Sequence, residues 1–346
     1  MALVKKLSAR LQNHPKRIVY TDGEDLRVLK AARQFATRKL GVPILLGNKE
    51  RILELAAANE IRADGIKIIN PPLSDDFDAL AKLLGGLPLF KDFDADSIRN
   101  MAAQPVYFAA LMLATGRCDA MITGAASATA HSLRPVMQII SKQRGVSAVS
   151  SMMVVSTGIE KLGVKGDLFL ADCGVIAEPD ERQLCDIAIT AATLAGNFTL
   201  QKPKVAMLSY VSKIANPKNA SVLKVIAATS LVREKIAADN LDMEVDGELQ
   251  VDAALNPDIA LAKGISSSVA GRANVLIFPD LNAGNITSKM LQITSSDVRC
   301  YGFILTGLVK PVGEISRGAS DSDIFGTSVI VAAQAVDRRF LSLEDE

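Results

Sequence analysis

The feature that most constrains the fold is an alternation, along almost the whole chain, of short apolar runs with longer runs of helical period. The short runs are rich in β-branched residues and often end in Gly, Asp or Ser, as strands do. They lie at 17–21, 42–47, 119–124, 147–156, 167–173, 204–210, 274–280 and 301–307. The longer runs repeat their apolar positions at α-helical spacing and lie at 25–40, 181–196, 220–238 and 321–339. This alternation predicts an α/β protein with largely parallel sheets.

The length of the chain favours two domains or one large α/β unit, because 346 residues are too many for one small core. Aromatic residues make up only 4% of the chain and there is no Trp, so the core must be built mainly from Ala, Val, Ile and Leu. We place the division between domains at KQRGVSA, 142–148. The predicted domains are 1–145 plus 301–346, to which the chain would return, and 146–300.

Charge and cysteine content exclude several classes of protein. Lys and Arg number 39 and Asp and Glu 38, which leaves no basic excess to hold DNA or RNA. The four cysteines form no CxxC pair and there are only two histidines, so we expect no metal site. No stretch approaches 18 continuous apolar residues, and the N-terminus lacks the apolar core of a signal peptide. We therefore expect a cytoplasmic protein, outside the membrane, with reduced cysteines.

Ligands of open α/β sheets bind beyond the carboxyl ends of the strands. Three stretches that follow predicted strands combine small residues, which allow a close approach of the backbone, with side-chain donors. They are TGAASATAHSLRP at 123–135, FPDLNAGN at 278–285 and VKPVGEISRGASDSD at 309–323.

The segment EISRGASDSDIFGT, 314–327, has two interpretations. Ser320 and Asp323 fit the capping box that starts a helix, and then Arg317 is a solvated surface charge. Alternatively, the glycine-flanked helix N-terminus binds an anion, to which Arg317 adds a bidentate fork and Ser316 a hydroxyl. Asp323 would then be placed to act as a general base. Asp321 is assigned only to helix capping.

Arg134, in SLRP after the predicted strand 119–124, offers a second arginine for an anion, or else is a surface arginine at the start of a helix. No GxxxxGK[ST] loop is present, and no GxGxxG follows a strand. A dinucleotide-dependent dehydrogenase is therefore disfavoured, because its glycine fingerprint and its clustered metal-binding aspartates are missing.

Several long motifs, in order, resemble those of the phosphate acetyltransferases (phosphotransacetylases) of the phosphate acetyl/butyryltransferase family. They are VDGELQVDAAL at 245–255, NVLIFPDLNAGNI at 274–286 and GLVKPVGEISRGAS at 307–320, supported by 171–189 and 132–140. The resemblance implies two α/β domains of the isocitrate/isopropylmalate dehydrogenase type, with the active site in the cleft between them, and a homodimer. It also implies the reaction acetyl-CoA + phosphate = CoA + acetyl phosphate, with no cofactor beyond the substrate CoA.

The resemblance also implies roles for individual residues. Asp323 would take the proton of the CoA thiol in a ternary complex, and the thiolate would attack the acetyl carbonyl. Arg317 would hold the phosphoryl or carbonyl oxygen, Ser316 would donate a hydrogen bond, and Arg134 would help to bind phosphate. The further candidate contacts for phosphate or CoA are Ser127, Thr129, Asn282, Gly284 and Asn285.

The chain departs from the family pattern at three places. No arginine aligns with the one the family commonly has near residues 81–100, where Lys82, Lys91 or Arg99 are the available cations. Glu-Pro at 178–179 stands in place of Asn-Pro, and the segment 209–221 is less rich in Gly and Thr.

Two other functions within the same fold remain as alternatives. One is a phosphate butyryltransferase. The other is a non-catalytic acyl-CoA-sensing module of the kind fused to malic enzymes, which often lacks the Ser-Arg pair that is present here at 316–317.

Overall fold

The computed structural model describes residues 2–294 and 297–337. Contacts within the chain divide it into two compact units. The central unit is built on residues 144–307, and the terminal unit joins residues 4–143 to the segment that begins at 308. Residues 301–307, which are predicted to belong to the first domain, lie in the central unit. The predicted α/β class with mostly parallel strands is confirmed.

Within the described residues, the terminal unit contains five strands in the order β3-β2-β1-β4-β11, and all of their pairings are parallel. These strands are β1 (Lys16–Tyr20), β2 (Gly41–Leu46), β3 (Lys67–Ile69), β4 (Ala120–Thr123) and β11 (Val312–Glu314). The sequence pattern missed β3 and β11, which are only three residues long. Because β1, β4 and β11 are neighbours and parallel, their carboxyl ends lie at one edge of the sheet.

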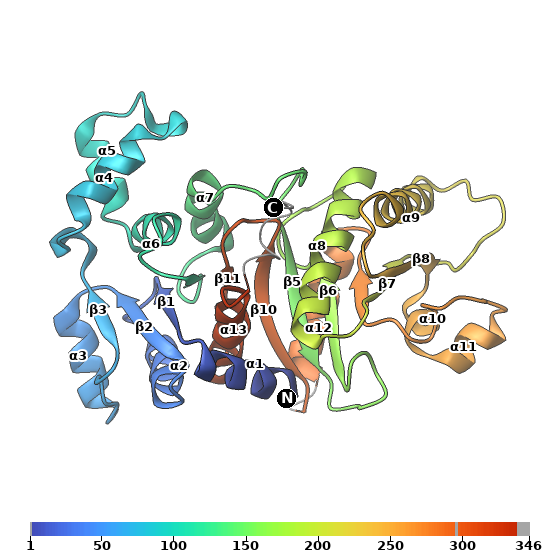
Figure 1. Cartoon of the computed structure of the whole chain (residues 1–346), viewed down its shortest axis with the longest axis horizontal. Helices are drawn as coiled ribbons and strands as arrows, with labels where there is room; N and C mark the ends of the chain where they lie inside the picture. Colours follow the sequence, from blue (N-terminus) through green and yellow to red (C-terminus); the bar gives the residue numbers. More distant parts are fainter. Residues whose placement is uncertain (1, 295–296, 338–346) are drawn as a thin grey trace. The chain divides into compact units, whose positions relative to one another are not determined.

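The helices of the terminal unit precede, connect or follow these strands (Figure 1). They are α1 (Ala2–Asn13), α2 (Leu26–Thr37), α3 (Lys49–Ala58), α4 (Phe77–Gly86), α5 (Ala95–Ala102), α6 (Pro105–Ala114), α7 (Thr129–Ile139) and α13 (Asp321–Gln334), with the 3₁₀ turns η1 (Pro71–Leu73) and η2 (Pro88–Phe90). Helices α2 and α13 pack against each other and against the strands, whereas α6 and α7 pack together.

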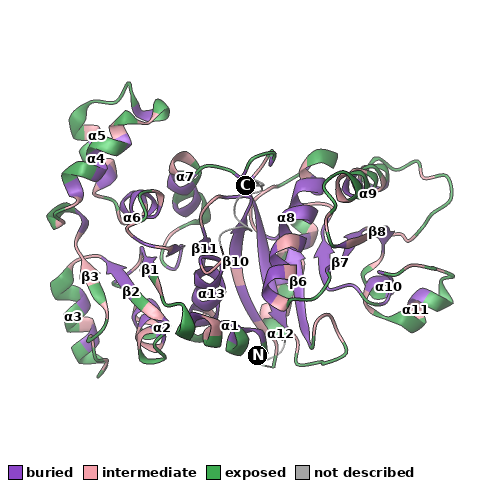
Figure 2. Ribbon diagram, in the orientation of Figure 1, coloured by how far each residue is buried: buried purple, intermediate pink, exposed green. Residues whose placement is uncertain are grey.

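Helix α13 is buried along almost its whole length from Ile324 to Gln334 (Figure 2). Gly313, in the neighbouring β11, lets this helix lie close, since a Cβ at that position would be 2.8 Å from side-chain carbons of Ile122 and Val331. A buried helix is held in place by its contacts, so its first turn is a rigid support for side chains placed there.

In the central unit, the part of the chain that the structure describes forms six strands in the order β10-β5-β6-β9-β7-β8. They are β5 (Ser150–Ser156), β6 (Asp167–Ala171), β7 (Lys204–Leu208), β8 (Glu244–Leu249), β9 (Val275–Ile277) and β10 (Arg299–Thr306). β5 is antiparallel to both β10 and β6, and the other pairings are parallel. The helices are α8 (Glu181–Thr199), α9 (Ala220–Ala238), α10 (Val251–Leu255), α11 (Pro257–Ala262) and α12 (Leu281–Thr294).

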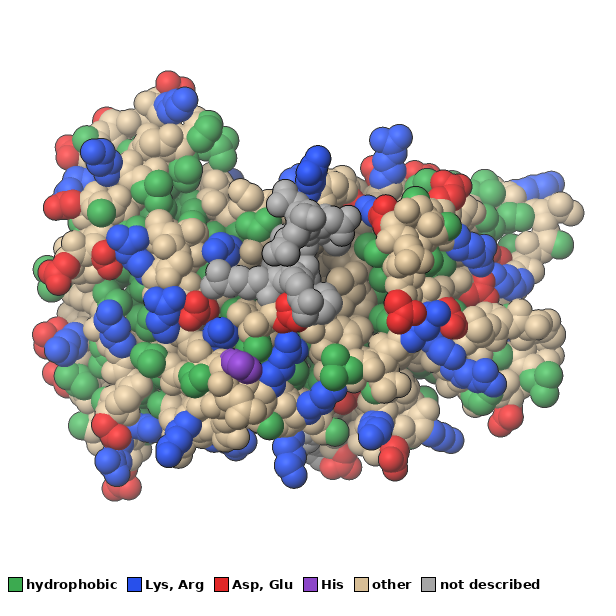
Figure 3. Space-filling model, in the orientation of Figure 1, with side chains coloured by type: hydrophobic (Ala, Val, Ile, Leu, Met, Phe, Trp, Pro, Cys, Tyr) green, Lys and Arg blue, Asp and Glu red, His purple; other side chains and the backbone are tan. Residues whose placement is uncertain are grey.

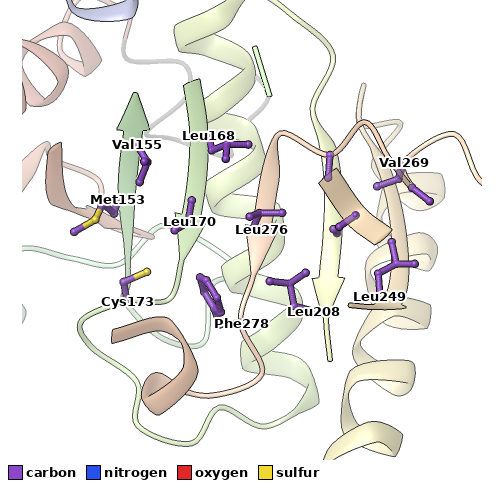
Figure 4. Packing of buried hydrophobic residues seen from close by; sticks show 14 of the residues in the cluster. Met153, Val155, Leu168, Leu170, Cys173, Leu208, Leu249, Val269, Leu276 and Phe278 are labelled. Atoms are coloured by element: carbon purple, nitrogen blue, oxygen red, sulfur yellow. The ribbon is translucent and has the colours of Figure 1, made fainter. Parts of the chain in front are cut away.

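The core of the central unit is mainly aliphatic, as the low aromatic content predicts (Figure 4). Leu170, Leu276 and Leu208 come from three neighbouring strands and are all buried. Burial of each such leucine contributes about 2 kcal/mol of hydrophobic stabilisation. Partly buried Ala283 and Leu291 of α12 pack against this cluster, so the core fixes the position of that helix.

Charged side chains of both signs are interspersed over the face of the molecule shown in Figure 3, in agreement with the net charge of +1. Within residues 2–294 and 297–337, no helix is both long enough and apolar enough to cross a membrane.

Candidate active site

The candidate site of the terminal unit is built from three loops that follow β1, β4 and β11, namely residues 21–25, 124–128 and 315–320. Direct hydrogen bonds join the starts of these loops. The Thr21 hydroxyl donates to the Thr123 hydroxyl at 3.0 Å, and the Ile315 amide donates to the Thr123 carbonyl at 2.7 Å. The sheet therefore brings together residues that are separated by hundreds of positions in the sequence.

Gly124 allows the second of these loops to run close to the third. Its φ is +94°, a conformation that disfavours residues with a side chain. A Cβ there would lie 2.8 Å from the Ile315 carbonyl oxygen and 2.9 Å from Oε1 of Glu314. Glycine is therefore required both for the turn and for the close approach.

Ser316, Arg317 and Asp323 lie at the start of α13, as the sequence predicts. Ser320 is the N-cap, and its hydroxyl accepts a hydrogen bond from the Asp323 amide at 3.2 Å. In return, Oδ2 of Asp323 accepts hydrogen bonds from the Ser320 amide at 3.0 Å and from the Ser320 hydroxyl at 2.6 Å. The predicted capping box is thus confirmed.

The capping box uses only one of the two carboxylate oxygens of Asp323. Among the described residues, Oδ1 of Asp323 accepts no hydrogen bond, and the residue is only partly buried. Capping and proton transfer therefore do not exclude each other at Asp323. The cap holds the carboxylate in one orientation and leaves an oxygen that can accept a proton.

Arg317 and Arg134 are both exposed, on the loop before α13 and on α7 respectively. Within the part of the chain that the structure describes, neither guanidinium makes a salt bridge. Burial raises the pKa of the Tyr107 hydroxyl, and the positive charge of Arg134 acts against that rise, so Arg134 lies near Tyr107. Two arginines without an internal carboxylate partner can both receive an external anion.

Ser127 and Thr129 also belong to this region, but each makes an internal hydrogen bond. The hydroxyls of Ser127 and Ser132 are 2.8 Å apart. The Thr129 hydroxyl donates to Oε1 of Glu314 at 2.9 Å. The hydrogen of Thr129 is therefore committed within the protein, and its oxygen can still accept a hydrogen bond from a ligand.

Sequence reasoning missed two charged residues of this region, Glu314 and Arg27. Glu314 is 2% exposed at the end of β11, and Arg27 contacts all three loops. Glu314 could have been recognised from the sequence, because an acidic residue at the end of a short apolar run indicates a carboxylate at the end of a strand. For Arg27 the sequence holds no such signal, because its acceptors on two of the loops are backbone carbonyls remote along the chain.

The remaining candidates, Asn282, Gly284 and Asn285, lie in the first turns of α12 in the central unit. Asn282 is exposed. A Cβ on Gly284 would lie 2.0 Å from the Asp172 carbonyl oxygen, and the Asn285 amide group donates to the Cys173 carbonyl at 3.0 Å. Gly284 and Asn285 thus hold α12 against the loop after β6, whereas the exposed Asn282 is accessible to a ligand.

Of the three cations considered as replacements for the family's arginine, Arg99 is already engaged. It pairs with Asp78 at 2.6 Å and stacks over the Phe77 ring. Lys82 and Lys91 are exposed. In residues 2–294 and 297–337, no group of three or more His, Cys, Asp or Glu side chains is placed to hold a metal ion.

Comparisons with known proteins agree with this arrangement. The family described as phosphate acetyl/butaryl transferase matches residues 2–332. A phosphate acetyltransferase from Acetivibrio thermocellus is 38% identical over 335 residues, which cover 97% of this chain and 98% of that protein. One from Clostridium acetobutylicum is 35% identical, over 97% of this chain and 99% of that protein.

Solved structures give the same result. A phosphotransacetylase from Staphylococcus aureus is 33% identical with a TM-score of 0.84, covering 96% of this chain and 98% of that one. A putative 4-hydroxythreonine-4-phosphate dehydrogenase from Salmonella typhimurium has a TM-score of 0.52 at 13% identity over 93% of this chain and 99% of that one, which shows a shared fold alone. The chain belongs to the phosphate acetyl/butyryl transferase family.

Proposed function

We propose that this chain is a phosphate acetyltransferase, an acyltransferase that converts acetyl-CoA and phosphate reversibly into acetyl phosphate and CoA. The observation that carries the proposal is the arrangement around the start of α13. The exposed Arg134 and Arg317, which have no carboxylate partner among the described residues, follow the adjoining strands β4 and β11. Asp323, the third residue of α13, has one carboxylate oxygen that accepts no hydrogen bond within the same residues. Intact Ser316, Arg317 and Asp323 favour an enzyme over a non-catalytic acyl-CoA-sensing module.

In the direction of CoA acetylation, Oδ1 of Asp323 takes the proton from the CoA thiol. The thiolate then attacks the acetyl carbonyl carbon of acetyl phosphate in a ternary complex. The new C–S bond forms, the carbonyl oxygen becomes an oxyanion, and the bond from carbon to the phosphate oxygen breaks. A thiol with a pKa of about 8.5 is only slightly ionised at neutral pH, so a base at this position increases the fraction of nucleophile.

Arg317 and Ser316 stabilise the charge that develops in this step, and Arg134 holds phosphate. Fixed donors aimed at a developing oxyanion or at a leaving phosphate typically contribute about 10²–10³-fold in rate. The exposed side chain of Asn282, in the central unit, is proposed as a contact for CoA. The proposal includes no metal and no cofactor other than the substrate CoA.

The test is the release of CoA from acetyl-CoA by the purified chain, measured with a thiol reagent, with and without phosphate. We expect release that depends on phosphate, with Arg317→Ala as the inactive control. Faster turnover with butyryl-CoA than with acetyl-CoA would reassign the chain to a phosphate butyryltransferase. CoA binding without phosphate-dependent turnover would contradict an enzymatic function and favour a sensing module.

We also propose that the enzyme is a cytoplasmic homodimer. All four cysteines are buried, and they form no disulfide within the part of the chain that the structure describes, which suits a reducing compartment. On α12, Ile286, Met290 and Ile293 are 65%, 60% and 85% exposed and lie at helical spacing along one face. A contiguous apolar stripe of this kind is suited to a contact with a second copy. Light scattering on the wild type and on Met290→Lys tests this. If the two proteins have the same molecular mass, the stripe is not the dimer contact.

A further inference from the structure

Arg27, in the first turn of α2, is a partly buried arginine to which neither the sequence pattern nor the proposed reaction gives a role. Its side chain is 32% exposed, and that of its partner Asp25 is 16% exposed. Asp25 is the N-cap of α2, and its side chain accepts a hydrogen bond from the Arg27 amide at 2.8 Å. The start of α2 therefore fixes both residues of the pair.

The guanidinium of Arg27 uses all five of its N–H donors within the protein. Two go to the carboxylate of Asp25, at 3.1 and 2.6 Å. The other three go to backbone carbonyls, namely Ala125 at 2.8 Å, Arg317 at 2.6 Å and Ala319 at 2.9 Å. These acceptors belong to the loops that follow β1, β4 and β11, so one side chain joins all three loops of the candidate site.

The charge of Arg27 is balanced by the same contacts. The hydrogen bonds to Asp25 raise the pKa of Arg27, although burial opposes this. Burial raises the pKa of Asp25, but the bonds from Arg27 outweigh it and bring that pKa below its usual value. The ion pair leaves Arg27 with no free donor for a substrate, in contrast to Arg134 and Arg317.

We propose that Arg27 is a positioning residue of the acetyl-transfer site, which holds the backbone of the 315–320 loop so that Ser316 and Arg317 meet the reacting atoms. This rests on the proposed function of that loop. Without the guanidinium, the carbonyls of Arg317 and Ala319, on either side of Gly318, would lose these donors, and the loop would lose its hydrogen bonds to α2. A displacement of about 1 Å in a reacting group costs on the order of 10²-fold in rate.

The chain offers a matched control in Arg17, at the amino end of β1. Arg17 pairs with Asp119 at 3.1 and 3.0 Å and donates to the carbonyls of Arg117 at 3.0 Å and Gly116 at 2.9 Å. It thus joins the chain segments at the opposite ends of β1 and β4. A role limited to folding predicts similar losses for Arg27→Met and Arg17→Met.

The experiment compares kcat, KM for phosphate and amide hydrogen exchange in Arg27→Met, Arg27→Lys and Arg17→Met. In folded protein, we expect Arg27→Met to lower kcat by about 10- to 100-fold and to speed exchange at the Ala319 amide, which bonds to the Ser316 carbonyl at 2.9 Å. Arg17→Met should change neither. Arg27→Lys keeps the positive charge but not the five guanidinium N–H donors, so its kcat should lie between those of Arg27→Met and the wild type.

Coupling to Arg317 gives a second readout. If Arg27 acts through the loop that carries Ser316 and Arg317, then Arg27→Met combined with Arg317→Ala will lose less activity than the product of the two single losses. Multiplying losses would overturn the proposal, as would full activity in Arg27→Lys or unchanged loop exchange in the folded Arg27 variants. If the wild type lacks phosphate-dependent turnover, the proposed function fails, while the exchange measurement still decides whether Arg27 holds the loop.

Discussion

The two roles of Asp323, helix capping and proton transfer, can be separated by comparing Asp323→Asn with Ser320→Ala. In the wild type, the Ser320 amide donates to Oδ2 of Asp323 at 3.0 Å. Asparagine keeps an oxygen that can accept this hydrogen bond, but it cannot act as a base. Ser320→Ala removes the hydroxyl that accepts from the Asp323 amide at 3.2 Å and donates to Oδ2 at 2.6 Å, and it leaves the carboxylate in place.

The expected magnitudes are well separated. Loss of a capping hydroxyl costs about 1 kcal/mol, which is small against the roughly 5–15 kcal/mol that stabilise a typical domain. Almost all of the protein therefore stays folded at 25 °C, and unfolding alone changes the activity very little. Loss of a general base lowers kcat by about 10²–10⁴-fold. We expect that range for Asp323→Asn and a change of less than about tenfold for Ser320→Ala.

The assay is phosphate-dependent release of CoA under saturating substrate, together with thermal unfolding of each variant. Ser320→Ala should lower the Tm by about 2–4 °C, the shift that 1 kcal/mol produces in a domain of this size. An equal loss of kcat in both variants would show that Asp323 acts by capping the helix. Near-normal turnover in folded Asp323→Asn would remove it from proton transfer altogether.

Three further predictions concern stability and the assay itself. Gly284→Ala should destabilise the protein by more than about 3 kcal/mol in urea unfolding, because its Cβ would lie 2.0 Å from the Asp172 carbonyl; a soluble variant of normal stability would contradict this packing. Burial raises the pKa of Asp119, but hydrogen bonds from Arg17 outweigh it and bring that pKa below its usual value. The stabilisation is therefore present above the unfolded pKa of about 3.9 and is lost as the pH falls through the folded pKa, so Asp119→Asn should be less stable than the wild type at pH 7, and the gap should close under acid. Burial raises the pKa of the Cys185 thiol to about 11, and all four cysteines are buried. At pH 8, a thiol reagent should therefore react slowly with the native protein. After unfolding, it should react rapidly with all four thiols.

The sequence predicted the elements that have a strong period of their own and missed those that depend on their neighbours. The helix at 220–238 was predicted with the bounds that the structure gives to α9. β11, with the sequence Val-Gly-Glu, has no strand pattern, and it exists because Val312, Gly313 and Glu314 pair with residues 121–123 of β4. Such short strands are fixed by tertiary pairing, which a local pattern does not contain.

The candidate site divides in the same way. Ser316, Arg317 and Asp323 were singled out because a capping box and a glycine-flanked arginine are local signals, and the family resemblance then suggested their roles. Arg27 was missed because its carbonyl acceptors lie 98, 290 and 292 positions away in the chain. A surface arginine and an arginine that organises three loops are identical in the sequence and differ only in what the fold places around them.

The hydrogen bonds of the site suggest a division of labour between residues of the same type. Arg27 donates all of its guanidinium N–H groups to the protein, so it can hold the loops together but has no donor left for a ligand. The exposed Arg134 and Arg317 make no salt bridge within the described residues, so they can bind an anion. Asp323 divides the same two tasks between its oxygens, since Oδ2 caps α13 and Oδ1 stays open. Rigidity and reactivity are compatible here because they use different atoms. If the proposed function holds, the 315–320 loop is ordered before substrate arrives by a side chain that does not touch the substrate.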